Sequence, residues 1–329
     1  MTAPAGRIRS LDALRGLAVC GIMLVNTWQH TRAHRGPTSI DWVMTNLFQS
    51  RFYPIFSFLF GIGFALFLRS ARERAERPHR VLLRRLAVLA AFGAAHRLVN
   101  SGDVLLPYAA LGAFLLLPAA VLPAPAVLLL GAGTTAVALI GGEPYVLIAA
   151  LFLLGLATVE YGGQERRPGP AAFAAAVVVT VPLTWWWNHG PPGGGVYQAA
   201  ALTGAAAYAS GFLLLARRTG RASLFEALGR MALTNYLTGT AVILLAMPIL
   251  VRDGTGTAIV AVSGVTVAAQ AAFSRWWLAR HRYGPLEWVW RSATWWRPVP
   301  NGQTGGRDEC CPVPDTDRAR PQGEPGGRP

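Results

Sequence analysis

The stretch LDALRGLAVCGIMLVNTWQ, residues 11–29, carries few charges and is close to the length at which a helix can cross a membrane. An α-helix needs about 20 apolar residues to cross the hydrocarbon core of a bilayer. Further apolar runs of similar length follow it along the chain, near residues 52–68, 82–99, 104–122, 125–142, 144–160, 170–187, 196–216, 231–251 and 256–278. We therefore predict an all-α, polytopic transmembrane helical bundle of about ten spans.

The overall composition agrees with a membrane protein. Of the 329 residues, 53% are hydrophobic and only 14% are charged, whereas soluble domains carry about 25% charged residues. The formal net charge of +14 would suggest nucleic-acid binding in a soluble protein. Here the arginines gather in short loops between apolar runs, as membrane topology requires. The composition therefore excludes an ordinary soluble enzyme, and we expect no nucleic-acid partner.

The arginine-rich loops predict the orientation of the chain, because loops that stay in the cytoplasm keep an excess of positive charge. Such loops lie at residues 69–85 and 217–230. With an even number of spans, both termini are expected in the cytoplasm and the protein in the plasma membrane. We expect residues 1–297 to form the membrane domain and the Pro/Gly-rich residues 298–329 to form a disordered cytoplasmic tail.

Two features near the end of the chain complete the organisation. Residues 283–298 interleave tryptophan with arginine, which predicts an amphipathic segment at the membrane interface. The three cysteines, Cys20, Cys310 and Cys311, form no CxxC pair, and two adjacent thiolates fall short of the four ligands of a structural zinc site. We therefore expect no metal site and no bound cofactor.

Polar residues recur on one face of the first apolar run. This face consists of Asp12, Gly16, Val19, Met23, Asn26 and His30, which follow one another at spacings of three or four residues. Arg15 lies one turn after Asp12. Polar groups within a membrane usually face the interior of the bundle, so this face is a candidate for substrate binding. Alternatively, Asp12 and Arg15 form an i,i+3 pair that caps the helix start and anchors the topology.

The loop after the first run holds two histidines, His30 and His34. A histidine near a carboxylate such as Asp41 can act as a general base toward a hydroxyl or an amine. A histidine in a wet loop can equally be a solvated surface residue. His34, with His30 as its rival, is the candidate catalytic residue.

Three further polar residues lie at the ends or in the middle of later apolar runs. His96 and Asp103 flank the turn after the third run and could line a polar cavity, although Asp103 could instead cap the next helix. Asn235 lies within the ninth run, where it could contact substrate or bond to neighbouring helices. All three are candidates for substrate binding.

Several ordered motifs resemble one known family. They are RIRSLDALRGLAVCGIMLVN (7–26), RFYPIFSFLFGIGFAL (51–66), SGDVLLPYAALG (101–112), LGRMALTNYLTGT (228–240) and GPLEWVWRSATWWRP (284–298). Together they resemble the YeiB-like domain-of-unknown-function family of bacterial inner-membrane proteins. That family is similar in turn to the membrane acyltransferase superfamily, which includes heparan-α-glucosaminide N-acetyltransferases and opens with the motif matched here by Arg9, Leu11, Asp12, Leu14, Arg15 and Gly16.

The resemblance implies a transmembrane acyltransferase that uses cytoplasmic acyl-CoA as donor. It also implies an envelope carbohydrate or lipid as acceptor, with the lipid bilayer as the other partner. The O-acyltransferase branch places a histidine where this chain has Asn26, so the chain departs from that pattern. The N-acetyltransferase-like branch uses a histidine in the following loop, which points to His30 or His34.

Two other classes of function stay open at this stage. A transporter or flippase for an envelope metabolite would also use a polar stripe along a helix, and a non-catalytic membrane partner protein would need no site at all. The sequence does not predict whether the protein is an enzyme, nor its oligomeric state.

Overall fold

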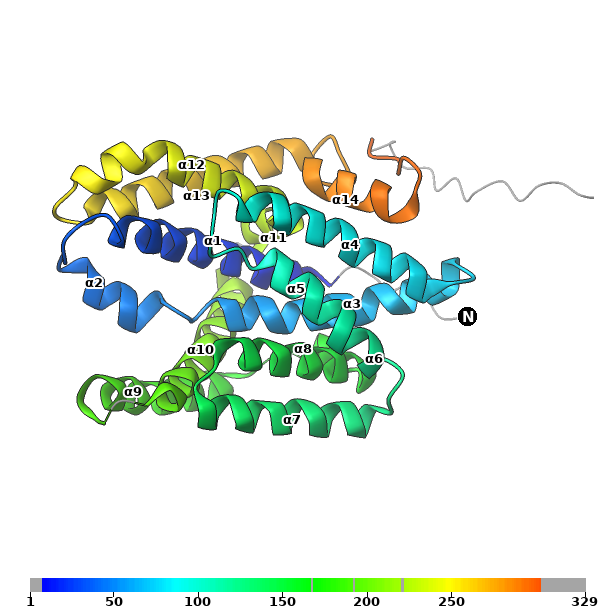
Figure 1. Cartoon of the computed structure of the whole chain (residues 1–329), viewed down its shortest axis with the longest axis horizontal. Helices are drawn as coiled ribbons and strands as arrows, with labels where there is room; N and C mark the ends of the chain where they lie inside the picture. The colour runs from blue at the N-terminus through cyan, green and yellow to red at the C-terminus, as the bar shows by residue number, and fades with distance from the viewer. Residues whose placement is uncertain (1–7, 167, 192, 220–221, 303–329) are drawn as a thin grey trace, which may run out of the picture.

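The computed structural model describes residues 8–166, 168–191, 193–219 and 222–302, and all of their regular elements are helices (Figure 1). These elements are α1 (Arg9–Arg32), α2 (Ile40–Val43), η1 (Met44–Phe48), α3 (Tyr53–Arg74), α4 (Pro78–Arg97), α5 (Leu105–Leu111), η2 (Gly112–Leu116), α6 (Leu117–Ala119), α7 (Ala124–Gly141), α8 (Pro144–Glu160), η3 (Gly163–Glu165), α9 (Pro170–His189), α10 (Gly194–Thr219), α11 (Ala222–Arg230), α12 (Ala232–Arg252), α13 (Thr257–Leu278) and α14 (Pro285–Trp295). The predicted all-α class is confirmed.

The positions of proline and glycine explain several helix ends. Proline lies in the first turn of α3, α4, α7, α8, α9 and α14, where its fixed φ suits a helix and its missing N–H is not needed. Gly142 adopts a left-handed conformation with φ 74° and ends α7. The next helix then begins at Pro144, which explains how α7 and α8 form a tight hairpin.

Seven segments of the described chain are long and apolar enough to cross a membrane. They comprise α1, the segment Ile40–Arg74, α7, α9, α10, α12 and α13. The helices Leu105–Ala119 and Pro144–Glu160 are apolar but shorter, and α4 carries arginines at positions 80, 84 and 85. Helices occupy all ten predicted ranges, but the number of spans stays a prediction.

α1 is the central helix of the bundle and packs against α3, α11, α12 and α13. On one side α3 packs against α8, which packs against α7 (Figure 1). On the other side α12 and α13 pair with each other. α9 has no buried residue and contacts mainly α10. Such an apolar but exposed helix is typical of one that faces lipid.

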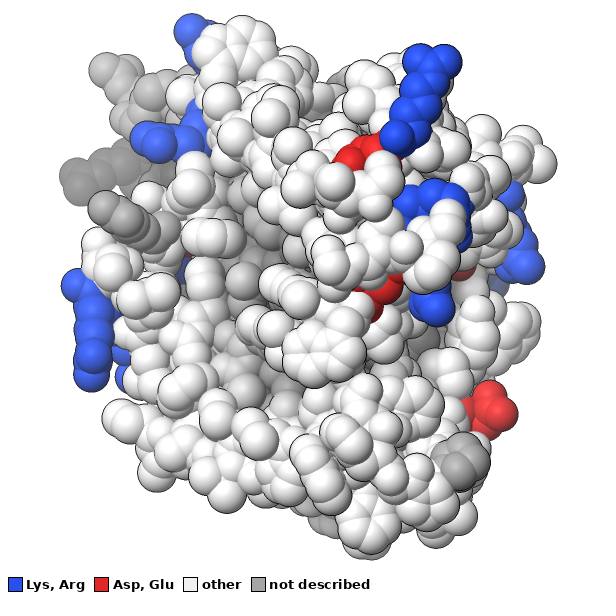
Figure 2. Space-filling model, turned by 90° about the vertical axis from the view of Figure 1, so that its left-hand side faces the viewer, with Lys and Arg blue, Asp and Glu red and all other residues white. Residues whose placement is uncertain are grey.

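Two ends of the bundle are named here after the ends of α1. The Arg9 end also holds the turn between α3 and α4, whereas the Arg32 end holds α2 (Figure 1). Figure 2 faces the Arg32 end, where most of the visible charged side chains lie in the upper half. Exposed tryptophans Trp42, Trp185 and Trp186 belong to this end as well, as expected for a ring of aromatic side chains at a membrane interface.

Close contacts between helix backbones depend on glycine. A Cβ atom at Gly16 would overlap the carbonyl of Phe225 in α11, and one at Gly229 would overlap the carbonyl of Asp12. Gly61 of α3 and Gly155 of α8 meet in the same way. Small residues let helix backbones approach closely within membranes, so these pairs determine how α1, α11, α3 and α8 are spaced.

The C-terminal part of the described chain is tied to α14. The backbone carbonyl of Val299 accepts a hydrogen bond from Trp288 Nε1 at 2.7 Å, and Asn301 Oδ1 accepts one from the Tyr283 amide at 2.8 Å. The predicted tail boundary at residue 298 therefore precedes residues that pack on the helical domain. Residues 303–329, with Cys310 and Cys311, lie outside the described residues.

The predicted orientation can be tested with reporter fusions. Fusions at Gly36 and Gly193, both at the Arg32 end, should give periplasmic signals. A fusion at Glu76, at the Arg9 end, should give a cytoplasmic signal, because Glu76 lies in an arginine-rich loop and such loops stay in the cytoplasm. Paired alkaline phosphatase and green fluorescent protein reporters measure the two sides. A cytoplasmic signal at Gly36 would reverse the predicted topology.

Candidate functional site

A cavity of about 1570 Å³ runs along α1. Its α1 lining begins at Ile8 and ends at Gln29; at 1.5 Å per residue these positions are about 32 Å apart along the helix. That length is comparable to the thickness of the hydrocarbon core. The lining side chains of this segment are Ile8, which directly precedes α1, and Leu11, Asp12, Arg15, Val19, Ile22, Val25, Asn26 and Gln29 of α1. One cavity therefore extends over most of the length of the central helix.

Seven arginines line this cavity, and three of them come from three different helices: Arg15 of α1, Arg85 of α4 and Arg291 of α14. We call these three the arginine cluster. Arg15 Nη1 forms an ion pair with Asp12 Oδ1 at 3.1 Å. The positive charges of Arg291 and Arg15 both act on Arg85 and oppose its own charge. The cavity lining as a whole has more arginines than carboxylates, because its acidic residues are Asp12, Glu73, Glu165 and Glu287.

Arg85 is held in place by aromatic rings rather than by a carboxylate. Its guanidinium lies 3.7 Å from the ring centroid of Trp290 and 4.5 Å from that of Phe67. Trp290 Nε1 donates a hydrogen bond to the Arg85 backbone carbonyl at 2.8 Å. The Arg85 Nη1 atom is buried and has no hydrogen-bond partner among the described residues. A buried donor without a partner costs roughly 1–3 kcal/mol, so a ligand acceptor would stabilise this site.

Glu287 also lines the cavity, but its carboxylate is engaged by the start of α12. It accepts hydrogen bonds from the Leu233 amide at 2.8 Å and from the Thr234 amide and hydroxyl at 3.0 and 2.7 Å. Burial raises the pKa of the Glu287 carboxyl above its ordinary value. These hydrogen bonds position α14 against the start of α12.

The middle of the cavity is apolar and its far end is polar. Phenylalanines of α3 and leucines of α4 line the middle part, together with Val19 and Ile22. Asn26, Gln29, Ser50 and Tyr145 line the Arg32 end. A charged end, an apolar middle and a neutral polar end suit an elongated, amphiphilic ligand with an anionic head.

The structure brings Asp12, Arg15 and Asn26 to the cavity, as the polar face of the first run predicts. Gly16, Met23 and His30 of the predicted face do not line the cavity. Gly16 packs on α11, and Met23 lies in a core cluster with Trp28. The lining face of α1 is therefore rotated toward Arg15, Ile22 and Gln29.

His30 and His34 are absent from the residues that line the cavity. His30 Nδ1 lies 2.9 Å from the Asn26 carbonyl, and His34 Nδ1 lies 2.9 Å from the His30 carbonyl. Each ring is thus hydrogen-bonded to a backbone carbonyl one turn earlier. The nearby Asp41 bonds to Trp28 and Arg35 instead.

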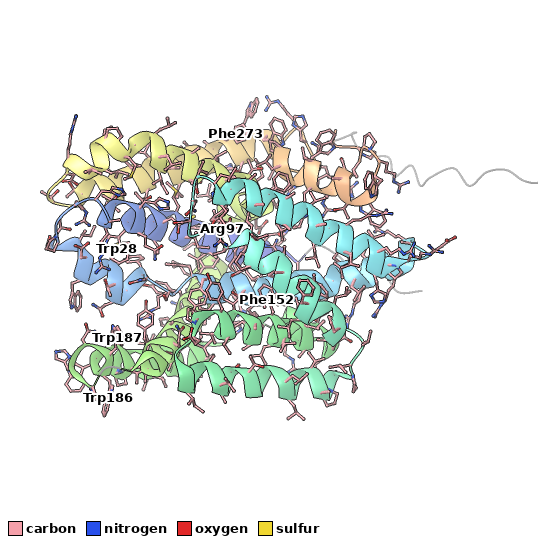
Figure 3. The ribbon with its side chains drawn as sticks, viewed as in Figure 1. Trp28, Arg97, Phe152, Trp186, Trp187 and Phe273 are labelled. Carbon is pink, nitrogen blue, oxygen red and sulfur yellow. The ribbon has the colours of Figure 1, made fainter. Side chains whose placement is uncertain are left out.

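His96 and Asp103 come together in the interior, where His96 Nδ1 lies 2.7 Å from Asp103 Oδ1. Their side chains are 3% and 0% exposed. His96 Nε2 lies 3.0 Å from the hydroxyl of Thr240 in α12, and the His96 ring packs against Tyr236 at 5.0 Å. Arg97, which follows His96 in the chain, lies between Trp28 and Phe152 along the bundle in Figure 3. A histidine, a carboxylate and a hydroxyl therefore meet in the interior of the protein.

Asn235 forms hydrogen bonds to neighbouring helices. Its side-chain amide donates to the Leu228 carbonyl at 3.1 Å and to the Ser274 hydroxyl at 3.3 Å, and its backbone carbonyl accepts a hydrogen bond from Gln270 Nε2 at 2.8 Å. These bonds join α11, α12 and α13. Asn235 does not line the cavity, although the adjacent Tyr236 does.

Several lining residues are absent from the sequence-based candidates: Arg85, Trp290, Arg291, Glu287 and Tyr236. Arg85 carries a usable signal, because it falls inside the predicted span 82–99 and an arginine within a membrane span points to function. Trp290 and Arg291 belong to the predicted interfacial segment, and only tertiary packing reveals that α14 faces inward. Among the described residues, no group of three His, Cys, Asp or Glu side chains could hold a metal ion.

Comparison with known proteins gives a family model and two relatives. Residues 164–297 match the family described as "Protein of unknown function (DUF418)". The chain is 32% identical over 331 residues to an "Uncharacterized 39.9 kDa protein in amylase 3'region" of Bacillus acidopullulyticus, covering 89% of this chain and 95% of that protein. It is also 32% identical over 129 residues to the "Uncharacterized protein YxaH" of Bacillus subtilis (strain 168), covering 34% of this chain and 32% of the relative. No solved structure matches the chain.

Proposed function

The chain belongs to the DUF418 family, and from the cavity along α1 we propose that it is a transmembrane acyltransferase. In this proposal an acyl group passes from cytoplasmic acyl-CoA to a carbohydrate or lipid of the cell envelope. The Arg9 end of the bundle then faces the cytoplasm, and the Arg32 end faces the acceptor in a plasma membrane.

The observation that carries the proposal is the arginine cluster at one end of an elongated cavity. The Arg85 Nη1 atom in this cluster is buried and has no hydrogen-bond partner among the described residues. Phosphate groups of a CoA-type donor would neutralise the excess charge, and arginine pairs with phosphate through two parallel hydrogen bonds. The apolar middle part would hold the pantetheine arm and the acyl chain.

The length of the cavity supports transfer across the bilayer. Asp12 and Asn26, both in the lining, are fourteen residues apart in α1, which is about 21 Å along the helix. An extended pantetheine arm bound at the arginine cluster would bring its thioester toward the middle of the bundle. An acceptor entering from the Arg32 end would meet it there.

The second candidate is a transporter or flippase for an anionic amphiphile. The length of the cavity also favours this candidate, because a cavity lined from Ile8 to Gln29 could provide a path across a membrane. The two proposals differ in whether a covalent bond is broken. Their common first step is the binding of an anionic head at the arginine cluster.

Purified full-length protein in liposomes, supplied with acetyl-CoA labelled in the acetyl group, separates these proposals. Acyl transfer predicts that label moves onto a lipid or carbohydrate of an added envelope extract and that free CoA appears in equal amount. Transport predicts passage of an anionic amphiphile without CoA release. Absence of CoA release with every extract would contradict the acyltransferase proposal.

A further inference from the structure

We infer that His96 is the general base that accepts a proton from the acceptor hydroxyl. The inference rests on the proposed acyl transfer and names the residue that would perform its proton step. The grounds are the position of His96 between Asp103 and Thr240 and the closeness of the cavity to this trio.

The trio has the geometry that activates an imidazole. Asp103 Oδ1 lies 2.7 Å from His96 Nδ1, so an ionised Asp103 keeps the proton on Nδ1 and leaves Nε2 free to accept one. Asp103 is itself oriented, because its Oδ2 accepts a hydrogen bond from the Leu106 amide at 2.9 Å. The Thr240 hydroxyl, 3.0 Å from Nε2, occupies the place that an acceptor hydroxyl would take.

Thr240 differs from its neighbour on the same helix in how its hydroxyl is bonded. Thr238, which is exposed, donates to the Thr234 carbonyl of its own helix at 2.8 Å, as helical threonines commonly do. The hydroxyl of Thr240 is directed to His96 instead. A rotation of χ1 would let Thr240 bond to the Tyr236 carbonyl and release Nε2 to an incoming hydroxyl.

The cavity reaches the immediate surroundings of this trio. Gly102 and Val104, which flank Asp103 in the chain, both line the cavity, and so does Tyr236. The Tyr236 ring contacts the His96 ring at a centroid distance of 5.0 Å. His96 itself does not line the cavity, but its ring contacts a side chain that does.

The proton and electron pairs balance in the inferred step. The acceptor oxygen forms a bond to the thioester carbonyl carbon while its proton moves to His96 Nε2. Collapse of the tetrahedral intermediate breaks the carbon–sulfur bond, and the leaving thiolate takes the proton from the imidazolium. Asp103 stays ionised and stabilises the imidazolium in between. The products are the acylated acceptor and free CoA.

The test measures acyl transfer in liposomes for three variants. His96→Gln should lose about 10²- to 10⁴-fold in rate, and Asp103→Asn at least about tenfold because it favours the wrong tautomer. The control Thr238→Val, whose hydroxyl is bonded within its own helix, should stay within about threefold of wild type, since Thr238 transfers no proton. A folded His96→Gln with undiminished rate, or a Thr238→Val as impaired as His96→Gln, would overturn the inference.

Chemical modification of the wild-type protein covers the case in which His96→Gln does not fold. Diethyl pyrocarbonate should carbethoxylate His96, activity should fall in step with that modification by peptide mass mapping, and hydroxylamine should restore it. Three results would contradict the inference. Activity could be lost in step with modification of His30 or His34 instead, or it could persist after His96 is modified. The third result is a His96 that does not react with the reagent in an active protein. If wild-type protein releases no CoA, the proposed function itself fails, which is a distinguishable outcome.

Discussion

Gly229→Ala should destabilise the protein strongly, although it adds a single methyl group. The added Cβ would overlap the backbone carbonyl of Asp12, which cannot rotate away as a side chain could. Overpacking of this kind costs roughly 1–3 kcal/mol and occasionally more, so we expect the melting temperature in detergent to fall by roughly 2–6 °C. Gly16→Ala, which meets the Phe225 carbonyl from the other side of the same interface, should behave alike.

A matched control comes from Gly264 in α13, where an added Cβ would meet no atom within 4 Å. Gly264→Ala should leave the melting temperature unchanged or raise it, since alanine in a helix is favoured over glycine by about 0.5–1 kcal/mol. Thermal unfolding monitored by size-exclusion chromatography of fluorescently tagged protein measures both. Equal melting temperatures for Gly229→Ala and wild type would mean that α1 and α11 do not pack as closely as described.

The contact between α1 and α11 also affects the candidate site, because Asp12 takes part in this contact and lines the cavity. Its backbone carbonyl meets Gly229, and its side chain lines the cavity beside Arg15. A shift of α1 away from α11 would therefore move one member of the arginine cluster. Gly16 of α1 and Gly229 of α11 thus help to position the Asp12 side chain through backbone packing alone.

The helices themselves are predictable from the sequence, because membrane spans are long, apolar and bounded by proline, glycine and arginine. The rotation of α1 is less predictable. Asp12, Val19 and Asn26 belong to the predicted face and to the lining, whereas Met23 and His30 do not line the cavity. Helical spacing alone is consistent with the predicted face and with the face that lines the cavity. Which of them faces the cavity depends on α11, because Gly229 lets α11 pack closely against one side of α1.

The site is only partly predictable for a related reason. His96 and Asp103 are seven residues apart, and their pairing at 2.7 Å could be anticipated from the turn between them. Their third partner, Thr240, is 144 residues from His96 in the chain, and no local pattern connects the two. Arg291 likewise resembles an interfacial anchor in sequence and joins the cavity only because α14 packs against α4 and α12.

Arg85→Met should weaken the binding of coenzyme A by roughly 10- to 100-fold, since a hydrogen-bonded charge pair contributes about 1.5–3 kcal/mol and 1.4 kcal/mol corresponds to tenfold. The buried Nη1 atom of Arg85 has no described partner and would bond to a phosphate oxygen. Methionine keeps an apolar contact with Trp290 and Phe67 but removes the charge. Equilibrium binding of labelled coenzyme A to purified protein in detergent measures the change.

Arg84→Met provides the matched control, because Arg84 is the adjacent residue of α4, is exposed and does not line the cavity. Its loss should change coenzyme A affinity less than about twofold, as expected for a screened surface charge. The ligand-free Arg85→Met protein should unfold within a few degrees of wild type, because relief of repulsion from Arg15 and Arg291 offsets the lost cation–π contacts. Equal affinities for Arg85→Met, Arg84→Met and wild type would show that the arginine cluster does not bind the donor, and the anionic head of the ligand would then have to be sought elsewhere along the cavity.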